Sequence, residues 1–203
     1  MAEHSPSSSP ATFADAAPAP PGSQVTITER ADLGLVTLQA RKGQEAALRE
    51  AIRQYCGVML PDRPAVASAD TIAFAGLGPQ HWLGMADGSS HRLATALKAA
   101  IGPLASIVDQ SGGYVVFRVG GPAIRDVLAK GFPIDLHERA FPPGAAATTV
   151  AAHIGAIIWR NEDQDGCASF DIAVFRSLSR SFWHWFSKAA AEFGCEVRAP
   201  ERG

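Results

Sequence analysis

The chain has 203 residues, enough for one substantial domain or two small ones. Its 47% of apolar and 19% of charged residues are typical of a globular protein and argue against an intrinsically disordered chain. Two of the 20 acidic side chains, Glu3 and Asp15, fall within residues 1–24, so the remainder carries 18 charges of each sign. Such a body has no basic excess that would attract nucleic acid or an anionic membrane.

The N-terminal segment and the cysteines indicate a cytoplasmic protein. Residues 1–24 are rich in Pro, Ala and Ser and have neither the basic start nor the apolar run of a secretion signal. We interpret them as a flexible arm, either disordered or ordered only along a neighbouring protein. The cysteines, at 56, 167 and 195, form no CxxC pair, which favours a reducing compartment. No apolar run reaches the roughly 18–20 residues of a membrane span.

The first half, residues 25–110, predicts the order β-α-β-β-α-β. The apolar residues of the first helix fall at helical spacing, and Gly57 stands where a left-handed C-terminal residue belongs. Ser89 or Ser90 is expected to cap the second helix, which ends before Gly102 and Pro103. The expected strands are 25–28, 33–39, 71–75, 81–86 and 105–109, and the expected helices are 44–56 and about 90–101.

The second half, residues 111–203, repeats this order. A helix is expected to open at Gly121-Pro122, with Pro at its first position, and to end at Gly131. A last helix begins at Ser179 and stops at Gly194. The expected strands are 114–119, 148–160, 170–175 and a closing edge strand at 195–198. The predicted fold is therefore α+β: two consecutive split β-α-β (ferredoxin-like) units with antiparallel sheets and helices on one face of each, together forming one compact domain.

No strong enzyme motif is present: the sequence lacks GxSxG, a Walker loop, HExxH and a complete GxGxxG. Two weaker candidates each have a plainer interpretation. The backbone of Gly120-Gly121-Pro122 could bind an anion at a helix start, or the glycines could serve only a tight turn. Asp109 could act as a base in the segment 109–113, although these residues also suit a turn between strands.

The ionisable residues form no recognisable metal or catalytic site. The histidines at 4, 81, 91, 137, 153 and 184 never pair with each other or with cysteine at metal-ligand spacing. Asp135, His137 and Glu138 cluster after Pro133, which is compatible with acid/base work but more typical of a solvated loop. We therefore assign no catalytic, cofactor-binding or metal-binding residue.

The aromatic residues of the last helix are the best candidates for a protein interface. Phe182 and Phe186 suit the core, but Trp183 and Trp185 extend the apolar surface beyond one helical stripe. These tryptophans contact either another part of the domain or a partner protein, since aromatic anchors are enriched in interfaces. We expect Trp183 or Trp185 to contact a partner.

An ordered set of short segments resembles one known family. The segments are Val108–Ser111, Gly120–Pro122 with Arg125–Leu128, Ile134–Leu136, Phe141–Gly144, Trp159-Arg160, and Phe175–Ser177 followed by Ser181–Trp183. Over residues 30–198 they resemble the gamma subunit of heterotetrameric sarcosine oxidase, which is similar in fold to the folate-binding domain of aminomethyltransferases.

The resemblance implies a role in sarcosine catabolism and one-carbon metabolism. Its alpha, beta and delta partners would carry FAD, FMN, NAD and zinc, and would use tetrahydrofolate. The complex would oxidise sarcosine to glycine, reduce oxygen to peroxide and form methylenetetrahydrofolate. The gamma chain of the family has no assigned catalytic group.

The residues support a loss of catalysis. In aminomethyltransferases the matching segment ends in an acidic residue, whereas 151–160 here contains none before Glu162. We therefore expect a non-catalytic, structural subunit. The alternatives are a stand-alone folate-dependent aminomethyl transferase, using Asp163 or Asp165 if the alignment shifts, and a regulatory module that binds a small molecule between its sheets.

Overall fold

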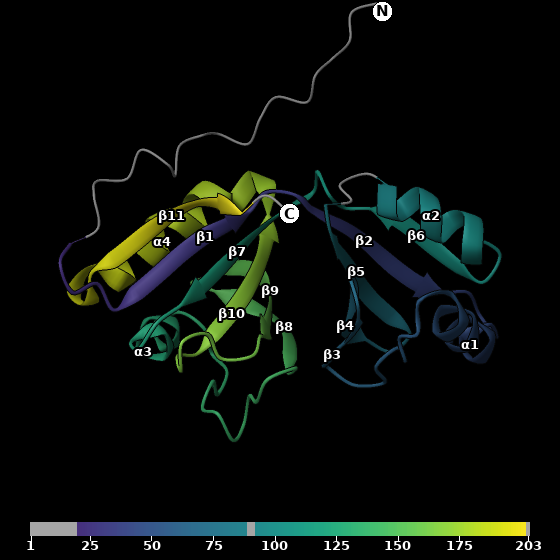
Figure 1. The fold of residues 1–203 in the computed structure, drawn as a ribbon, viewed down its shortest axis with the longest axis horizontal. Coiled ribbons are helices and arrows are strands. Elements are labelled where there is room, and N and C mark those ends of the chain that lie inside the picture. Colours follow the sequence, from purple (N-terminus) through teal and green to yellow (C-terminus); the bar gives the residue numbers. More distant parts are fainter. Residues whose placement is uncertain (1–19, 89–91, 202–203) are drawn as a thin grey trace, which may run out of the picture.

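Two β-sheets lie face to face, and the helices cover their outer faces (Figure 1). The structure is a computed structural model that describes residues 20–88 and 92–201. Most of the expected arm and the expected caps Ser89 and Ser90 lie outside these ranges. Among the described residues no helix is both long and apolar enough to cross a membrane. The predicted α+β class with antiparallel sheets is confirmed.

The first unit is a five-stranded antiparallel sheet with two helices. Its strand order is β3-β4-β5-β2-β6, and α1 and α2 pack on one face. Its elements are β2 (Leu33–Ala40), α1 (Glu45–Cys56), β3 (Val66–Ala69), β4 (Ile72–Gly78), β5 (His81–Asp87), α2 (Arg92–Ile101) and β6 (Ala105–Asp109). Apart from the short edge strand β3, this is the predicted split β-α-β order.

Helix α1 shows how the sequence pattern produces the local structure. Leu48 and Ile52, one turn apart, are fully buried against the sheet, while Glu50 and Arg53 face solvent. Gly57 follows the helix with φ +75° and donates its N–H to the carbonyl of Arg53. A residue with a side chain is strained at this dihedral, so glycine ends the helix here as predicted.

The second unit is a six-stranded sheet in the order β11-β1-β7-β10-β9-β8, with α3 and α4 on its outer face. Its elements are β1 (Val25–Arg30), β7 (Tyr114–Gly120), α3 (Ile124–Ala129), β8 (Ala146–Ala151), β9 (Ile154–Arg160), β10 (Ser169–Phe175), the 3₁₀ turn η2 (Arg176–Leu178), α4 (Ser179–Ala190), the 3₁₀ turn η3 (Ala191–Phe193) and β11 (Cys195–Glu201). The predicted edge strand after Gly194 is present.

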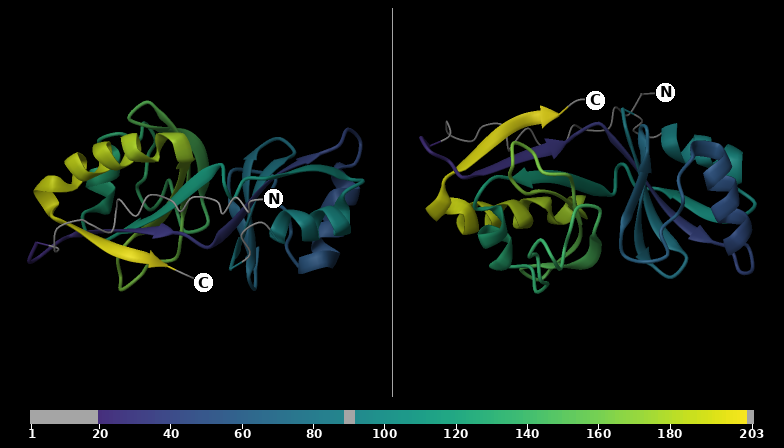
Figure 2. Two further views of the ribbon diagram at one scale, coloured as in Figure 1. Left: turned by 90° about the horizontal axis from the view of Figure 1, so that it is seen from above. Right: turned by 60° about the horizontal axis from the view of Figure 1, so that its bottom comes forward.

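The N-terminal strand does not lie where the predicted boundary at residue 110 put it. Strand β1 pairs antiparallel with β7 and parallel with β11, so it belongs to the second sheet although it opens the first half of the sequence. The chain then crosses directly into β2 of the first sheet, and Figures 1 and 2 show β1 running beside β11. Local patterning identifies a strand but not the sheet that it joins.

Two local expectations in the second half differ from the structure. Residues 148–160 were expected to form one strand, but Ala152 and His153 turn the chain with φ of +45° and +76° and separate β8 from β9. Helix α3 begins at Ile124, not at Pro122, because Ala123 donates its N–H at 3.2 Å to the carbonyl of Gln24, directly before β1. A Cβ on Gly121, at φ +114°, would lie 2.3 Å from the carbonyl oxygen of Gln24.

The inner faces of the two sheets meet in a third apolar cluster. Leu35 and Leu83 of the first sheet pack there against Ile157 and Ala173 of the second. Strand β10 is consequently covered on both sides, and every residue from Ser169 to Val174 is buried. The edge strands β3 and β8 are also linked, since the N–H of Val66 donates to the carbonyl of Gly144 at 2.7 Å.

Candidate functional site between the two sheets

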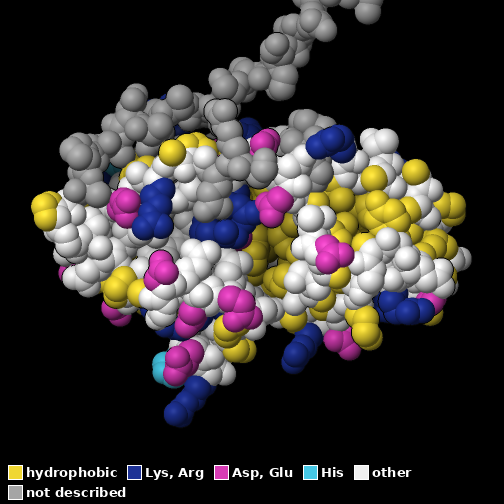
Figure 3. All heavy atoms as spheres, viewed as in Figure 1, with side chains coloured by type: hydrophobic (Ala, Val, Ile, Leu, Met, Phe, Trp, Pro, Cys, Tyr) yellow, Lys and Arg dark blue, Asp and Glu magenta, His cyan; other side chains and the backbone are white. Residues whose placement is uncertain are grey.

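Beside the inter-sheet cluster the two inner faces separate and leave a cleft of about 380 Å³. Figure 3 shows the hollow between the two halves, with basic, acidic and apolar side chains around it. The first sheet contributes the apolar side chains of Val66, Ala73 and Met85, whereas the second contributes Arg118, Asp171 and Trp159. Clefts of this size between two units commonly bind small molecules.

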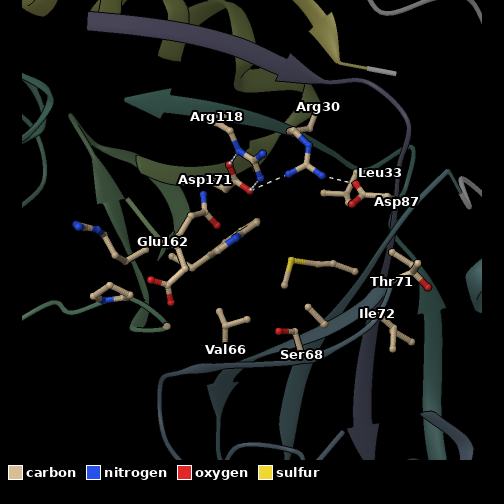
Figure 4. Close-up of a pocket in the computed structure, with 18 of the residues that line it drawn as sticks. Arg30, Leu33, Val66, Ser68, Thr71, Ile72, Asp87, Arg118, Glu162 and Asp171 are labelled. Atoms are coloured by element: carbon tan, nitrogen blue, oxygen red, sulfur yellow. Dashed lines mark hydrogen bonds and ion pairs between the residues drawn. The ribbon is translucent and has the colours of Figure 1, made fainter. Parts of the chain in front are cut away.

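A buried carboxylate organises the polar wall. Asp171 on β10 is 2% exposed and accepts hydrogen bonds from Arg118 Nε at 2.8 Å and Nη2 at 2.9 Å. Arg30, at the end of β1, donates from Nη1 to the same carboxylate at 3.1 Å and forms a second ion pair with Asp87 of β5 (Figure 4). Because Asp87 belongs to the first sheet, this network joins the two sheets at the edge of the cleft.

Strand alternation explains why Asp171 faces the cleft. Its neighbours Phe170 and Ile172 point into the core beneath the helices, so Asp171 points to the opposite face. It lies directly across from Arg118 on β7 and from Trp159 on β9. None of these side chains was predicted from the sequence to form a site. Arg118 and Asp171 are each the one charged residue of an otherwise mostly apolar strand, and this pattern could have indicated them.

Four buried polar atoms on β9, on β10 and directly after β9 lack a hydrogen-bond partner among the described residues. These atoms are Asn161 Nδ2 and Ser169 Oγ, together with Nε and Nη1 of Arg160. The Arg160 side chain faces the opposite, helix-covered side of the sheet, where it stacks over Phe170 at 5.2 Å. Asn161 and Ser169 lie opposite each other, joined by the backbone bond from Asn161 N to Ser169 O at 2.9 Å.

The most strongly shifted ionisation constants lie outside the cleft. Burial raises the pKa of the Cys195 thiol to about 11, and the nearby charge of Glu196 adds to the effect. On the surface of α1, hydrogen bonds from Arg53 and Gln54 lower the pKa of Glu50 to about 2. Among the residues that the structure describes, the lining of the cleft contains no His, Cys, Lys or Tyr side chain.

The two glycine-containing candidates from the sequence are turns. Asp109 Oδ1 accepts the N–H of Ser111 at 2.9 Å, the short-range bond typical of an aspartate that begins a turn. Gly121 permits a close approach to the backbone before β1, as described above, and α3 is only six residues long. The structure therefore does not bring Asp109 or Gly121 together with the cleft residues.

The acidic candidates also have local partners. Asp135 Oδ1 accepts the N–H of His137 at 2.9 Å within an exposed turn, and Asp163 forms an ion pair with Arg160. Asp165 lies in the exposed turn between β9 and β10 with φ +53°. Within residues 20–88 and 92–201 no group of three or more His, Cys, Asp or Glu side chains could hold a metal ion.

The structure gives the two tryptophans of α4 different surroundings. Trp185 lies 5.9 Å from the ring of Phe132 and 5.7 Å from that of Phe182, and a Cβ on Gly131 would approach its Cζ2 to 2.2 Å. Trp185 of α4 thus packs against the residues that directly follow α3. Trp183 is half-buried at the margin of the same core.

Comparison with known proteins identifies the family. The model of the sarcosine oxidase gamma subunit family matches residues 41–192. Sarcosine oxidase subunit gamma of Corynebacterium sp. (strain P-1) is 36% identical over 157 residues, covering 76% of this chain and 73% of the relative. The protein of the same name from Corynebacterium sp. (strain U-96) is 31% identical over 172 residues, covering 83% and 80%.

Solved structures agree with this relationship. A chain of heterotetrameric sarcosine oxidase from Corynebacterium sp. U-96, in complex with pyrrole 2-carboxylate, superposes with a TM-score of 0.74 at 32% identity, covering 87% of this chain and 88% of that one. Glycine cleavage aminomethyltransferase T from Bartonella henselae shares the fold at 13% identity, with a TM-score of 0.62 over 88% of this chain and 48% of that one. The chain therefore belongs to the sarcosine oxidase gamma subunit family.

Proposed function

We propose that this chain is the non-catalytic gamma subunit of a cytoplasmic heterotetrameric sarcosine oxidase. The observation that carries the proposal is its likeness, over 87% of its length, to a chain of a solved heterotetrameric sarcosine oxidase. Its partners are then the alpha, beta and delta subunits, which hold FAD, FMN, NAD and zinc. The assembled complex converts sarcosine, tetrahydrofolate and oxygen to glycine, methylenetetrahydrofolate and peroxide.

The cleft chemistry supports an architectural role for this chain. Asp171, the buried carboxylate of the cleft, is engaged by two guanidinium groups, and Asp163 is paired with Arg160. A transferase needs a carboxylate placed to assist the substrate nitrogen. The fold shared with aminomethyltransferase T keeps open the alternative of a stand-alone folate-dependent transferase, which requires folate binding by the isolated chain and its loss in Asp163→Asn.

Co-expression tests the proposed function. The tagged full chain is produced with and without the candidate flavoprotein subunits and passed over a size-exclusion column with absorbance read at flavin wavelengths. We expect the chain to co-elute with flavin only when the partners are present, and to produce no peroxide from sarcosine by itself. Elution as a separate peak alongside an intact flavoprotein, or turnover by the chain alone, would contradict the proposal.

The interface within this complex is proposed to include Trp183. Both tryptophans are partly buried against the core of the second unit, and Trp185 contacts the rings of Phe132, Phe182 and Phe186. Trp183→Ala is expected to weaken assembly by about 2 kcal/mol or more and to change the stability of the isolated chain much less. Trp185→Ala is the matched comparison, and it should destabilise the isolated chain. Unimpaired assembly of Trp183→Ala would assign Trp183 to the core.

A further inference from the structure

The solvent-facing side of helix α4 carries a row of basic residues. Arg180, His184 and Lys188, here called the basic row, lie one helical turn apart from each other, and all three are exposed. The opposite side of the helix is buried in the core of the second unit, where Phe182 and Phe186 pack. Figure 2 shows this yellow-green helix on the outside of the second unit, so the basic row points away from the molecule.

The basic row is not neutralised by the part of the chain that the structure describes. Helix α4 contains no acidic residue, and no described side chain forms an ion pair with the row. Glu192, one turn beyond Lys188, forms an ion pair with Lys130. The exposed side of α1, by contrast, pairs its own Glu50 with Arg53. The carboxylates that would neutralise the basic row therefore have to come from elsewhere.

Arg180 is the member of the row that the isolated fold does not favour. It lies in the first turn of α4, where the helix dipole stabilises an acidic side chain and disfavours a basic one. Lys188 lies in the last turn, where the dipole favours a cation, so its charge already suits the helix. Arg180 therefore gains most from contact with acidic groups of another molecule.

Apolar side chains border the basic row. Phe175 and Leu178 directly precede α4, and they are 47% and 37% exposed. Trp183 and Trp185 flank the row on its two sides and are partly buried against the core. Protein interfaces combine aromatic and apolar residues with a charged, solvent-accessible rim. The outer side of α4 and the residues before it have this composition, which a fully solvated helix face lacks.

We propose that the solvent-facing side of α4 docks onto an acidic surface of the flavoprotein subunits, a proposal that rests on the proposed function. Charge complementarity selects this occupant, because the basic row lacks carboxylates of its own. A second copy of this chain fits less well, since a symmetric contact through α4 sets the basic row against itself. The balanced charge of the rest of the chain disfavours nucleic acid or an anionic membrane.

Competition for limiting flavoprotein subunits tests this surface. The wild-type full chain and a variant are co-expressed with those subunits, the complex is purified through the subunits, and mass spectrometry gives each form's share of the complex relative to its share of the total chain. Arg180→Glu should be at least about fivefold under-represented, and Arg180→Glu with Lys188→Glu at least about tenfold. Arg180→Gln removes the charge without reversing it and should lie between wild type and Arg180→Glu. Lys98→Glu, the same reversal on exposed α2, should compete equally with wild type.

Thermal unfolding of the isolated chain separates docking from folding. Arg180→Glu should leave the melting temperature unchanged or higher, because a carboxylate in the first turn suits the helix dipole. Under-representation together with a lower melting temperature would assign Arg180 to folding and overturn the proposal, as would equal representation of wild type and Arg180→Glu. Equal representation with loss of binding to phosphatidylglycerol vesicles would assign the row to a membrane surface instead. If wild type itself fails to co-elute with the flavoprotein, the proposed function fails as well, whereas equal representation contradicts only this surface.

Discussion

Replacing Asp171 with alanine removes the carboxylate on which Arg30 and Arg118 converge. The side chain is 2% exposed and accepts hydrogen bonds from Arg118 at 2.8 and 2.9 Å and from Arg30 at 3.1 Å. Breaking a buried ion pair by deleting one partner costs about 3–5 kcal/mol, because the remaining charge stays desolvated. The side chains of Arg30 and Arg118 keep 11% and 22% exposure, so water reaches part of both guanidinium groups. We therefore expect a loss at the lower end, about 3 kcal/mol.

Equilibrium urea unfolding of the full chain measures this loss. With a slope of about 2 kcal/mol per molar, the midpoint of Asp171→Ala should fall by about 1.5 M. Asp171→Asn keeps the shape but not the charge and should lie between wild type and Asp171→Ala. Asp87→Ala removes an ion-pair partner that is 58% exposed and should cost less than about 1 kcal/mol. Equal losses for Asp171→Ala and Asp87→Ala would refute the view that burial gives the network its strength.

Three further changes test other parts of the structure. Folding raises the pKa of the Cys195 thiol to about 11, so between pH 9 and 11 the unfolded chain binds fewer protons than the folded chain. The free energy of unfolding should therefore fall as pH rises through this interval. Urea titrations of Cys195→Ala should not show that fall. Gly131→Ala places a Cβ 2.2 Å from Trp185, and urea unfolding should show a loss of about 1–3 kcal/mol together with altered tryptophan fluorescence. The double substitution Ala152→Asn and His153→Gly places an Asn-Gly pair at the two positive φ angles between β8 and β9. It should raise the free energy of unfolding by about 1 kcal/mol, measured as a higher midpoint of thermal unfolding.

Helices and most strands could be predicted from the sequence because their signals are local. The spacing of Leu48 and Ile52, with Gly57 after them, defines α1 whatever the helix packs on. The turn at Ala152 and His153 was missed for the same reason: neither residue is a usual turn former, and pairing of β8 with β9 imposes the positive φ angles. Strand residues flanking them on both sides gave the pattern of a single strand.

The family could also be recognised from the sequence, since the segments that carry the resemblance are spread over the ordered part of the chain. The cleft could not be recognised from the sequence. Its polar wall brings together Arg30, Arg118, Asn161 and Asp171, which come from four separate strand ends or strands. Trp185 likewise appeared as an interface candidate because the sequence does not show that Phe132 and Gly131 lie beneath it.

The amino-acid sequence by itself determined the helices and most of the strands, the left-handed helix end at Gly57 and the absence of the common enzyme motifs, because these depend on neighbours along the chain. Only the tertiary structure decided that β1 joins the second sheet, that Arg30 and Arg118 share Asp171, and that Asn161 and Asp171 line one cleft. Strand order and inter-sheet packing fix these contacts, and both arise from pairings between residues far apart in sequence, which no local pattern records.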